Sequence, residues 1–381
     1  MSDVPLGAFL SGGIDSSLIV AMMSKHVHEK LETFTMGFGG DAAAVMDERP
    51  YAKMVSKRYD TNYNDYSVSP DFESIADDLI SSFDEPFSDD SIIPSYYISM
   101  FTREKVKVAL SGLGGDELFG GYHRYYGFKL SQYYQYFPGF LHRAIVKPLV
   151  NCLPEPKAGS DRINHIKRFI NNAELSPAER YLAFVSAAGK TERRSMYQAE
   201  VANAIDYSKT DSIITGPFHA SDATNDMDRM YYTDIKTYLP DDILALSDRL
   251  SMKHSLELRV PFIDHKLVEL TAKMPPGLKI KWNDKKYILK KIARKFLPAQ
   301  VIDHRKQGFE SPMASWLKGD LKDFANEILS EKNINDIGYF DYAYVSKKLN
   351  EHYSNRQKNN KILFSLIMFH LWAKREGITR I

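Results

Sequence analysis

The stretch that most narrows the folds open to this chain is residues 11–17, with the sequence SGGIDSS. Residues 7–10 before it are apolar and predict a buried strand, and the apolar residues 18–23 after it predict a packed helix. Glycines let backbone N–H groups approach an anion, and the helix N-terminus favours negative charge there. A carboxylate at such a site, Asp15, indicates a bound Mg²⁺. The sequence therefore predicts a nucleoside triphosphate site with its metal.

The order of residues in this turn separates it from other phosphate-binding motifs. No Lys follows the glycines, so it is not a Walker A loop, and it is not G-x-G-x-x-G. An ordinary Ser/Gly turn before a helix is the structural alternative. The order S-G-G-x-D-S-S resembles the PP-loop of the ATP pyrophosphatases. That resemblance implies cleavage of ATP between the α and β phosphates and adenylation of a substrate.

A second Gly-rich turn repeats the pattern. Residues 106–110 predict another buried strand, which leads into SGLGGDELFGGY at residues 111–122. Turns at the carboxyl ends of parallel strands gather at one edge of the sheet, where ligands bind. We therefore expect Asp116 to face Asp15 across one Mg²⁺–pyrophosphate group, with a helix cap as the alternative role. Glu117 points away on a helix and is expected to act as a cap or a supporting group.

Further blocks make the resemblance specific. The chain resembles the synthetase domain of the glutamine-dependent asparagine synthetases from about residue 2 to residue 373, and is most similar to the asparagine synthetase B-like and exopolysaccharide-type amidotransferases of bacteria. The blocks that carry the resemblance, besides the two turns, are FDEPF at 83–87, DRLSM at 248–252, ELRVPFID at 257–264, and RKQGF at 305–309 with Pro312 and Trp316-Leu317.

Strand and helix signals alternate over residues 1–125. Strands are predicted at 33–38 and 62–68, and helices at 47–59 and 92–101. This alternation predicts an α/β fold with a doubly wound parallel sheet, and the resemblance implies the adenine-nucleotide α-hydrolase type. Strand signals fade after residue 125. We expect residues 126–381 to be mainly helical and to pack on the sheet core.

Composition limits the partners. The chain of 381 residues has 50 Lys and Arg against 49 Asp and Glu, so no basic field for nucleic acid is expected. No apolar run of spanning length occurs, so no membrane partner is expected, and Cys152 as the single cysteine excludes an internal disulfide. The expected compartment is the cytoplasm.

The resemblance also implies a nitrogen source. The resembled enzymes carry an N-terminal glutaminase domain with a Cys nucleophile, whereas here the predicted first strand begins almost at once. We therefore expect that this chain alone does not hydrolyse glutamine, and that ammonia arrives free or from a glutaminase domain or subunit. The family makes a homodimer an expected assembly.

Site residues follow from the motifs and the resemblance. Lys306 is expected to neutralise charge on the α-phosphate, Lys286 is a second cation of this kind, and Glu257 is expected to orient the acceptor or the amine. The alternatives are an exposed loop lysine for Lys306 and a structural ion pair for Glu257. The residues expected at ATP are Leu10, Ser11, Gly12, Gly13, Asp15, Ser16, Ser17, Met36, Ser111 and Gly112, with Asp15 and Asp116 as Mg²⁺ ligands. Leu10 and Met36 are apolar and equally fit a core role.

One position departs from the family. The residue after Ser-Gly in the second turn is usually acidic in asparagine synthetases and a tyrosine in β-lactam-forming relatives, but here it is Leu113, which cannot accept a proton. The predicted reaction is adenylation of a carboxylate, foremost aspartate, followed by transfer of ammonia. A different acceptor such as a sugar acid, or a divergent nucleotide-binding subunit with little catalysis, are the alternatives.

Overall fold

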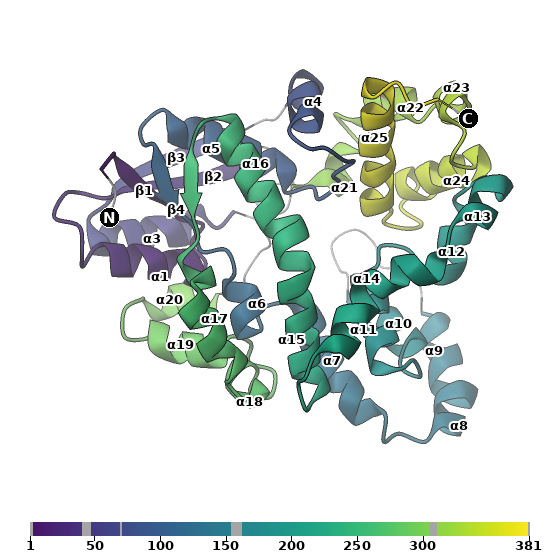
Figure 1. Ribbon diagram of the computed structural model, residues 1–381, viewed down its shortest axis with the longest axis horizontal. Coiled ribbons are helices and arrows are strands. Elements are labelled where there is room, and N and C mark those ends of the chain that lie inside the picture. The colour runs from purple at the N-terminus through teal and green to yellow at the C-terminus, as the bar shows by residue number, and fades with distance from the viewer. Residues whose placement is uncertain (1–2, 40–46, 69–70, 154–161, 305–310, 380–381) are drawn as a thin grey trace. The chain divides into compact units, whose positions relative to one another are not determined.

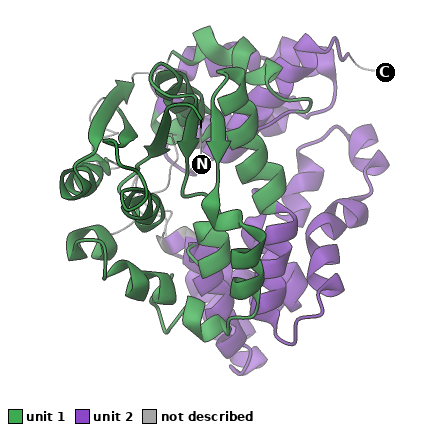
Figure 2. Cartoon of the chain, turned by 60° about the vertical axis from the view of Figure 1, so that its left-hand side comes forward, with its two compact units in different colours: residues 1–85, 89–121, 238–315 green, residues 86–88, 122–237, 316–381 purple. Residues whose placement is uncertain are grey.

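The computed structural model describes residues 3–39, 47–68, 71–153, 162–304 and 311–379. The chain forms two compact units (Figure 2). The sheet unit comprises Met1–Glu85, Asp89–Gly121 and Tyr238–Ser315, and the helical unit comprises Pro86–Ser88, Tyr122–Thr237 and Trp316–Ile381. The structure thus divides the chain differently from the predicted boundary at residue 125, because residues 238–315 return to the sheet unit.

The sheet unit is built on five parallel strands. They are β1 (Leu6–Phe9), β2 (Glu32–Phe38), β3 (Asn62–Val68), β4 (Val108–Leu110) and β5 (Glu257–Arg259), in the order β3-β2-β1-β4-β5. The predicted doubly wound α/β fold and the first four strands are confirmed. The edge strand β5 lies in the part of the chain that was predicted to be mainly helical. It has three residues, two of them exposed and charged, so it carries no apolar periodicity to detect.

Helices cover both faces of this sheet (Figure 1). On one face, Phe34 of β2 and Ala109 of β4 form a buried cluster with Ile98 of α5 (Ile92–Arg103). On the other face lie α1 (Ile14–Met23) and α3 (Arg49–Tyr59). Burial of both faces explains why the central strands read as short apolar runs.

The other helical elements of the sheet unit are short. They are α4 (Phe72–Ser81), α6 (Gly115–Phe119), the π-helical turn η2 (Leu239–Leu244), α16 (Ala245–Lys253), the 3₁₀ turn η3 (Pro261–Ile263), α17 (His265–Ala272), α18 (Pro276–Lys279), α19 (Tyr287–Ala293) and α20 (Ala299–Asp303). Helix α21 (Met313–Trp316) ends at the boundary between the units. Among the helices in the described ranges, none is long and apolar enough to cross a membrane.

The described part of the helical unit consists of helices and connecting turns. Its helices are α7 (His123–Tyr134), α8 (Gly139–Leu141), the π-helical turn η1 (His142–Val146), α9 (Lys147–Asn151), α10 (Arg162–Asn171), α11 (Pro177–Val185), α12 (Lys190–Ser195), α13 (Ala199–Ala204), α14 (Tyr207–Ala220), α15 (Asp226–Lys236), α22 (Lys322–Ile328), α23 (Glu331–Ile337), α24 (Tyr342–Tyr353) and α25 (Asn360–Arg375). In its core, buried Asp234 accepts hydrogen bonds from Arg124 and from the hydroxyls of Tyr125 and Tyr181. These donors stabilise a carboxylate that would be costly to bury alone.

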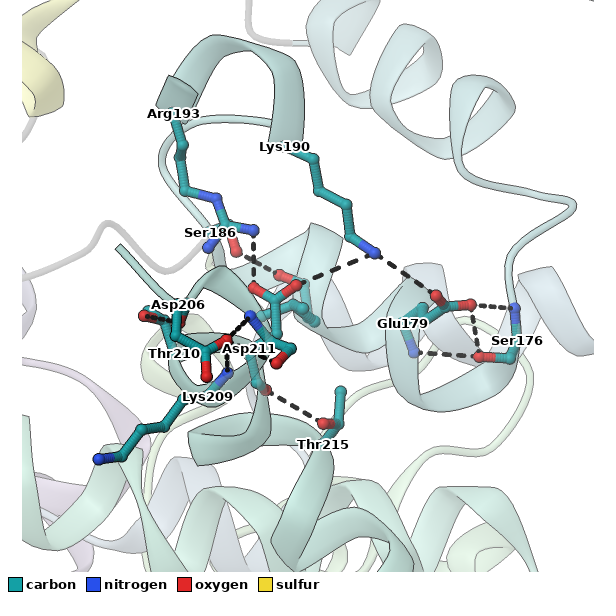
Figure 3. Close-up of polar contacts among 12 residues, drawn as sticks. Ser176, Glu179, Ser186, Lys190, Arg193, Asp206, Lys209, Thr210, Asp211 and Thr215 are labelled. Atoms are coloured by element: carbon teal, nitrogen blue, oxygen red, sulfur yellow. Dashed lines mark hydrogen bonds and ion pairs between the residues drawn. The ribbon is translucent and has the colours of Figure 1, made fainter. Parts of the chain in front are cut away.

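Local sequence signals set several of these helices. Helix α11 begins with a capping box, in which Ser176 and Glu179 satisfy each other's backbone N–H groups, and Pro177 occupies the first helical position. Figure 3 shows the polar contacts that follow, with Lys190 between Glu179 and Asp211 at 3.5 and 3.9 Å and Arg193 bonded to Asp211 at 2.6 Å. These ion pairs connect α11, α12 and α14 within the unit.

Candidate nucleotide site

The first Gly-rich turn is closed by its own hydroxyls. The Ser11 amide donates to Ser16 Oγ at 3.2 Å, and Ser16 Oγ donates to the Gly13 carbonyl at 3.2 Å. Gly12 has φ +89°, and a methyl group there would lie 2.7 Å from the carbonyl oxygen of Glu48. Only glycine adopts this positive φ without strain and leaves room for the Glu48 carbonyl oxygen. Gly12 therefore allows the chain to turn just before the N-terminus of α1.

Ser17 supplies a hydroxyl that the described part of the chain does not satisfy. Its side chain is fully buried, and its Oγ has no hydrogen-bond partner among the described residues. Buried hydroxyls almost always have a partner. A bound group that accepts a hydrogen bond at the N-terminus of α1 would satisfy this donor.

The second Gly-rich turn packs directly against the first. A methyl group at Gly112 would lie 2.6 Å from the Ser16 amide nitrogen, and one at Gly115 would lie 2.6 Å from Asp15 Oδ1. The adjacent parallel strands β1 and β4 bring both turns to one edge of the sheet. The structure therefore brings Asp15 and Asp116 close together, and their role as ligands of Mg²⁺ stays a prediction.

Lys286 joins these two carboxylates. Its Nζ lies 2.5 Å from Asp15 Oδ2 and 2.8 Å from Asp116 Oδ1, and Lys286 is only 5% exposed. Asp15 is 7% exposed. Each carboxylate is thus within charge-assisted hydrogen-bond distance of one ammonium group.

The backbone at Lys286 is unusual for a residue with a side chain. It caps the N-terminus of α19 with φ 53° and ψ 33°, in the left-handed region. Non-glycine residues occupy this region infrequently and at a cost in free energy, and functional sites are one place where they do so. Here the conformation directs the lysine stem toward the two turns.

Gly121 makes room for this cluster. A methyl group at position 121 would overlap Asp116 Oδ1 and would lie only 2.3 Å from Lys286 Cε. Gly115 and Gly121 were not among the predicted site residues, although both lie in the second Gly-rich turn. Their roles depend on which side chains approach them, and local sequence does not contain that information.

The other residues expected at ATP lie near this edge. Leu10 is fully buried, and its carbonyl accepts a hydrogen bond from Thr35 Oγ1 at 2.6 Å. Ser111 is 5% exposed, and its amide donates to the Arg259 carbonyl at 2.9 Å. Met36 is partly buried and packs against the apolar cluster that contains Phe34 and Ile98. This position is compatible with a core role and with a nucleotide contact.

One of the expected catalytic residues, Glu257, does not join this cluster. Glu257 pairs in register with Val108, at the amino end of β4, whereas both Gly-rich turns follow the carboxyl ends of their strands. It forms an exposed ion pair with Arg259 at 2.7 Å, so the geometry favours the structural alternative stated for it. Lys306 lies outside the described residues.

Known proteins are similar to this chain over nearly its whole length. The family model described as Asparagine synthase matches residues 1–374. Asparagine synthetase [glutamine-hydrolyzing] 1 of Bacillus subtilis (strain 168) is 30% identical over 377 residues, which are 97% of this chain and 56% of that protein. A putative asparagine synthetase [glutamine-hydrolyzing] of Mycobacterium tuberculosis (strain ATCC 25618 / H37Rv) is 32% identical over 380 residues, covering 97% of this chain and 54% of that protein. This chain therefore spans about half the length of these curated relatives.

A more distant relative has a different name. Amidase chry2 of Gibberella zeae is 24% identical over 421 residues, which cover 100% of this chain and 60% of that protein.

Proposed function

Because the chain belongs to the asparagine synthase family, we propose that it is an ATP-dependent amide ligase that adenylates a carboxylate and then transfers ammonia to it. The observation that carries this proposal is the cluster of Asp15, Asp116 and Lys286 between two Gly-rich turns. A cradle of amides, two carboxylates and one cation has the groups needed to hold a triphosphate and to stabilise charge during phosphoryl chemistry.

The proposed reaction has two steps. An oxygen of the substrate carboxylate attacks the α-phosphorus of ATP, the bond from that phosphorus to the bridging oxygen of pyrophosphate breaks, and an acyl-adenylate forms. Ammonia then attacks the acyl carbon, AMP leaves with the bonding electrons, and the amine loses its extra proton. The N-terminus of α1 and the buried Ser17 hydroxyl are suited to hold the pyrophosphate oxygens.

The donor set fits Mg²⁺. Proteins bind Mg²⁺ through one or two carboxylates together with substrate phosphates, and Asp15 and Asp116 are two such groups. No group of three or more His, Cys, Asp or Glu suited to a metal occurs among the described residues. Substrate phosphates and water would supply the other ligands of a bound Mg²⁺. The ion supplies neutralisation of phosphate charge when it is bound.

Lys286 has two roles in this proposal. Without nucleotide, its ammonium holds the two carboxylates together in the buried site. With Mg²⁺ held by Asp15 and Asp116, the Lys286 ammonium would be placed to donate hydrogen bonds to phosphate oxygens. Lys306 remains a proposed second cation for the α-phosphate.

Aspartate is the proposed acceptor, with another carboxylate such as a sugar acid as the second candidate. Leu113 favours the second candidate, because it stands where asparagine synthetases usually have an acidic residue. It is half-buried, and its amide donates a hydrogen bond to Ser111 Oγ at 3.4 Å. Its side chain can neither accept a proton from ammonium nor hold a charge. The amidase name of one relative extends the matched set beyond asparagine synthetases.

Pyrophosphate release from Mg·ATP tests the proposal. Wild-type chain is incubated with aspartate or with one of a panel of sugar acids and other carboxylic acids, with and without ammonium. Release with aspartate and formation of asparagine supports the first candidate, and release only with another acid supports the second. Absence of release with every acid contradicts the ligase proposal and favours a nucleotide-binding subunit.

Two variants locate the chemistry. Asp15→Asn is expected to lower pyrophosphate release by roughly 10²-fold or more, whereas Asp226→Asn, in the first turn of α15, is the matched control and retains activity. Leu113→Asp is expected to increase amide formation with aspartate if the leucine limits that reaction. An unchanged rate in Leu113→Asp would show that the leucine is tolerated.

A further inference from the structure

The start of helix α3 packs directly against the first Gly-rich turn. An added methyl group at Gly12 would lie 2.7 Å from the Glu48 carbonyl oxygen and 2.9 Å from the Ala52 amide nitrogen. The same carbonyl oxygen accepts hydrogen bonds from the Tyr51 and Ala52 amides, at 3.0 and 3.2 Å, which close the first turn of α3. The conformation available at Gly12 therefore depends on where this end of α3 lies.

His304, at the C-terminal end of α20, contacts the start of α3 in two ways. Its ring stacks on the Tyr51 ring, with centroids 4.0 Å apart and an interplanar angle of 16°. Its Nε2 lies 3.3 Å from Glu48 Oε1, and the side chains of His304 and Glu48 are only 6% and 14% exposed. Glu48 thus presents its carbonyl oxygen to Gly12 and its carboxylate to His304.

Both nitrogens of the His304 imidazole face oxygen atoms. Nδ1 lies 2.8 Å from the Val301 carbonyl oxygen, which can only accept a hydrogen bond, so the proton is assigned to Nδ1. In a neutral ring, Nε2 would then present its lone pair to the ionised Glu48 carboxylate. In the imidazolium form, Nε2 donates a hydrogen bond to that carboxylate instead. The contact between α20 and α3 is therefore complete only when His304 is protonated.

Glu48 is the described carboxylate that reaches the ring nitrogens of His304. The hydrogen bond to Glu48 raises the pKa of His304, and burial of the ring opposes this. Tyr51 contacts the face of the ring rather than its nitrogen edge, and the neighbouring Asp303 bonds to Arg294 at 2.7 Å. The imidazolium is thus present at low pH and is lost as pH rises through the raised pKa.

We propose, on the basis of the function proposed above, that Glu48 and protonated His304 are positioning residues of the nucleotide site. The ion pair fixes Glu48, and the Glu48 carbonyl oxygen limits the conformation of the turn at Gly12. That turn leads into α1, whose N-terminus is proposed to hold the pyrophosphate oxygens. Affinity for Mg·ATP is therefore highest while His304 is protonated.

The opposite end of α3 has an anchor of its own. The Tyr59 hydroxyl donates to the Phe296 carbonyl oxygen at 2.8 Å, and Lys25, just after α1, lies 4.3 Å from the centre of the Phe296 ring. These contacts do not involve Glu48 or His304. Loss of the ion pair should consequently shift the first turn of α3 without detaching the helix.

An ion pair that only stabilises the fold would give a different result. It would change the free energy of unfolding with pH, but it would leave the nucleotide affinity of the folded protein unchanged. The deciding measurement is therefore affinity, determined at temperatures where circular dichroism shows each variant to be folded.

Binding of the α,β-methylene analogue of ATP with MgCl₂ tests the proposal, because this analogue is not cleaved between the α and β phosphates. Isothermal titration calorimetry with the full chain gives its Kd from about pH 6 to about pH 8.5. We expect the Kd of wild type to rise at least about three-fold over this range. The phosphates of the analogue also titrate here, so the comparison with variants decides.

Two variants separate charge from shape. Glu48→Gln keeps the shape of the side chain and pairs with either form of His304, because an amide both donates and accepts hydrogen bonds. Its Kd should lack the part of the pH dependence that wild type owes to His304. His304→Phe keeps a ring against Tyr51 but has no proton to donate, so its Kd near pH 6 should be roughly three- to ten-fold above that of wild type. His265→Gln, at the exposed start of α17, is the control and should match wild type at every pH.

Reciprocity between the two equilibria gives a second measurement. If protonation of His304 strengthens nucleotide binding, bound nucleotide must raise the pKa of His304 by the same coupling. NMR titration of the histidine ring protons, with and without the analogue and MgCl₂, measures this pKa, and the spectrum of His304→Phe assigns the signal. The pKa of His304 should rise when the analogue binds, and that of His265 should not.

Two results would overturn this role of His304. They are an equal pH dependence of Kd in wild type and Glu48→Gln, and a His304 pKa that does not change when the analogue binds. Either would make the contact a purely structural pair and would leave the proposed ligase reaction standing. Binding with the expected pH dependence, but no pyrophosphate release with any acid, would instead contradict the ligase proposal alone. No binding of the analogue would contradict both.

Discussion

Two buried lysines, one in each unit, show how the same charge pattern can serve different ends. Lys286 of the sheet unit is 5% exposed and lies between Asp15 and Asp116. Lys348 of the helical unit is 6% exposed and bonds to Glu192 at 2.6 Å, with Glu351 at 3.6 Å. Each ammonium group thus neutralises carboxylates that burial would otherwise penalise.

The surroundings of the two lysines differ. Lys348 lies within α24, its partner Glu351 is on the same helix, and Gln357 Oε1 lies 3.4 Å from its Nζ. Its ammonium also lies 5.4 Å from the Tyr344 ring. These partners come from helices and from the turn after α24, and none belongs to a Gly-rich turn.

Lys286 instead occupies a left-handed backbone position beside two Gly-rich turns in which added methyl groups have no room. The comparison teaches that a buried lysine between carboxylates is not by itself a sign of function. The backbone conformation of the lysine and the two Gly-rich turns beside it distinguish the two cases.

Replacing each lysine gives the largest expected effects. Lys286→Met should lower the free energy of unfolding by on the order of 3–5 kcal/mol, because it leaves Asp15 buried without its cation. Lys348→Met should lower it by less, because the side chains of Glu192 and Glu351 are 30% and 19% exposed. Mg²⁺ should restore more of the loss in Lys286→Met than in Lys348→Met, since Asp15 and Asp116 are the proposed ligands of the ion. Urea unfolding with and without MgCl₂ measures the loss of stability in each variant and its recovery by Mg²⁺.

Activity separates the same two variants. Lys286→Met should lower pyrophosphate release by roughly 10²- to 10³-fold, while the folded fraction of Lys348→Met should keep the wild-type rate. Equal recovery of both variants by Mg²⁺, or equal loss of activity, would remove the distinction drawn between the two lysines.

The next effect concerns a glycine in each unit. Gly121→Ala should lower the free energy of unfolding by about 1–3 kcal/mol and reduce ligase activity, because the methyl group would overlap the Asp116 carboxylate. Gly127→Ala, within α7 and with its nearest neighbour at 3.8 Å, should raise the free energy of unfolding by about 0.5–1 kcal/mol. Thermal unfolding and pyrophosphate release of both variants check this, and tolerance of Gly121→Ala would show that the cluster is looser than the structure indicates.

The smallest effect is a pH dependence in the sheet unit. His304 Nε2 lies 3.3 Å from Glu48 Oε1, and this hydrogen bond raises the pKa of His304. The protonated histidine therefore contributes stability that is fully present below its unfolded pKa of about 6.5 and is lost as pH rises through the higher folded value.

Substitution of His304 tests that dependence. The difference in unfolding free energy between wild type and His304→Gln should shrink with rising pH, by on the order of 1 kcal/mol or less. His265→Gln, at the exposed start of α17, is the matched control. A difference that stays constant across the pH range would show that the ion pair contributes nothing to stability.

Sequence reasoning reached most of the sheet and part of the site. The strands β1 to β4 and helices α1, α3 and α5 carry apolar patterns of the expected period, so their positions were predictable to within a few residues. The edge strand β5 has no such pattern and was missed. Glu257 was expected near the chemistry because it lies in a family block, yet the parallel register places it at the other end of the sheet.

By itself, the sequence determined the local elements of the site. Glycines at residues 12, 13, 112 and 114–115, hydroxyls at residues 11, 16 and 17, and two carboxylates each follow a strand, and these properties depend on neighbours along the chain. Only the tertiary structure decided that Lys286 meets Asp15, 271 residues away, and that Gly121 leaves room for both Lys286 and Asp116. The sheet order places β4 beside β1, and a left-handed residue at the start of α19 directs the lysine inward. Neither the strand order nor a positive φ at a lysine is encoded in local propensity, because both are set by packing between distant segments.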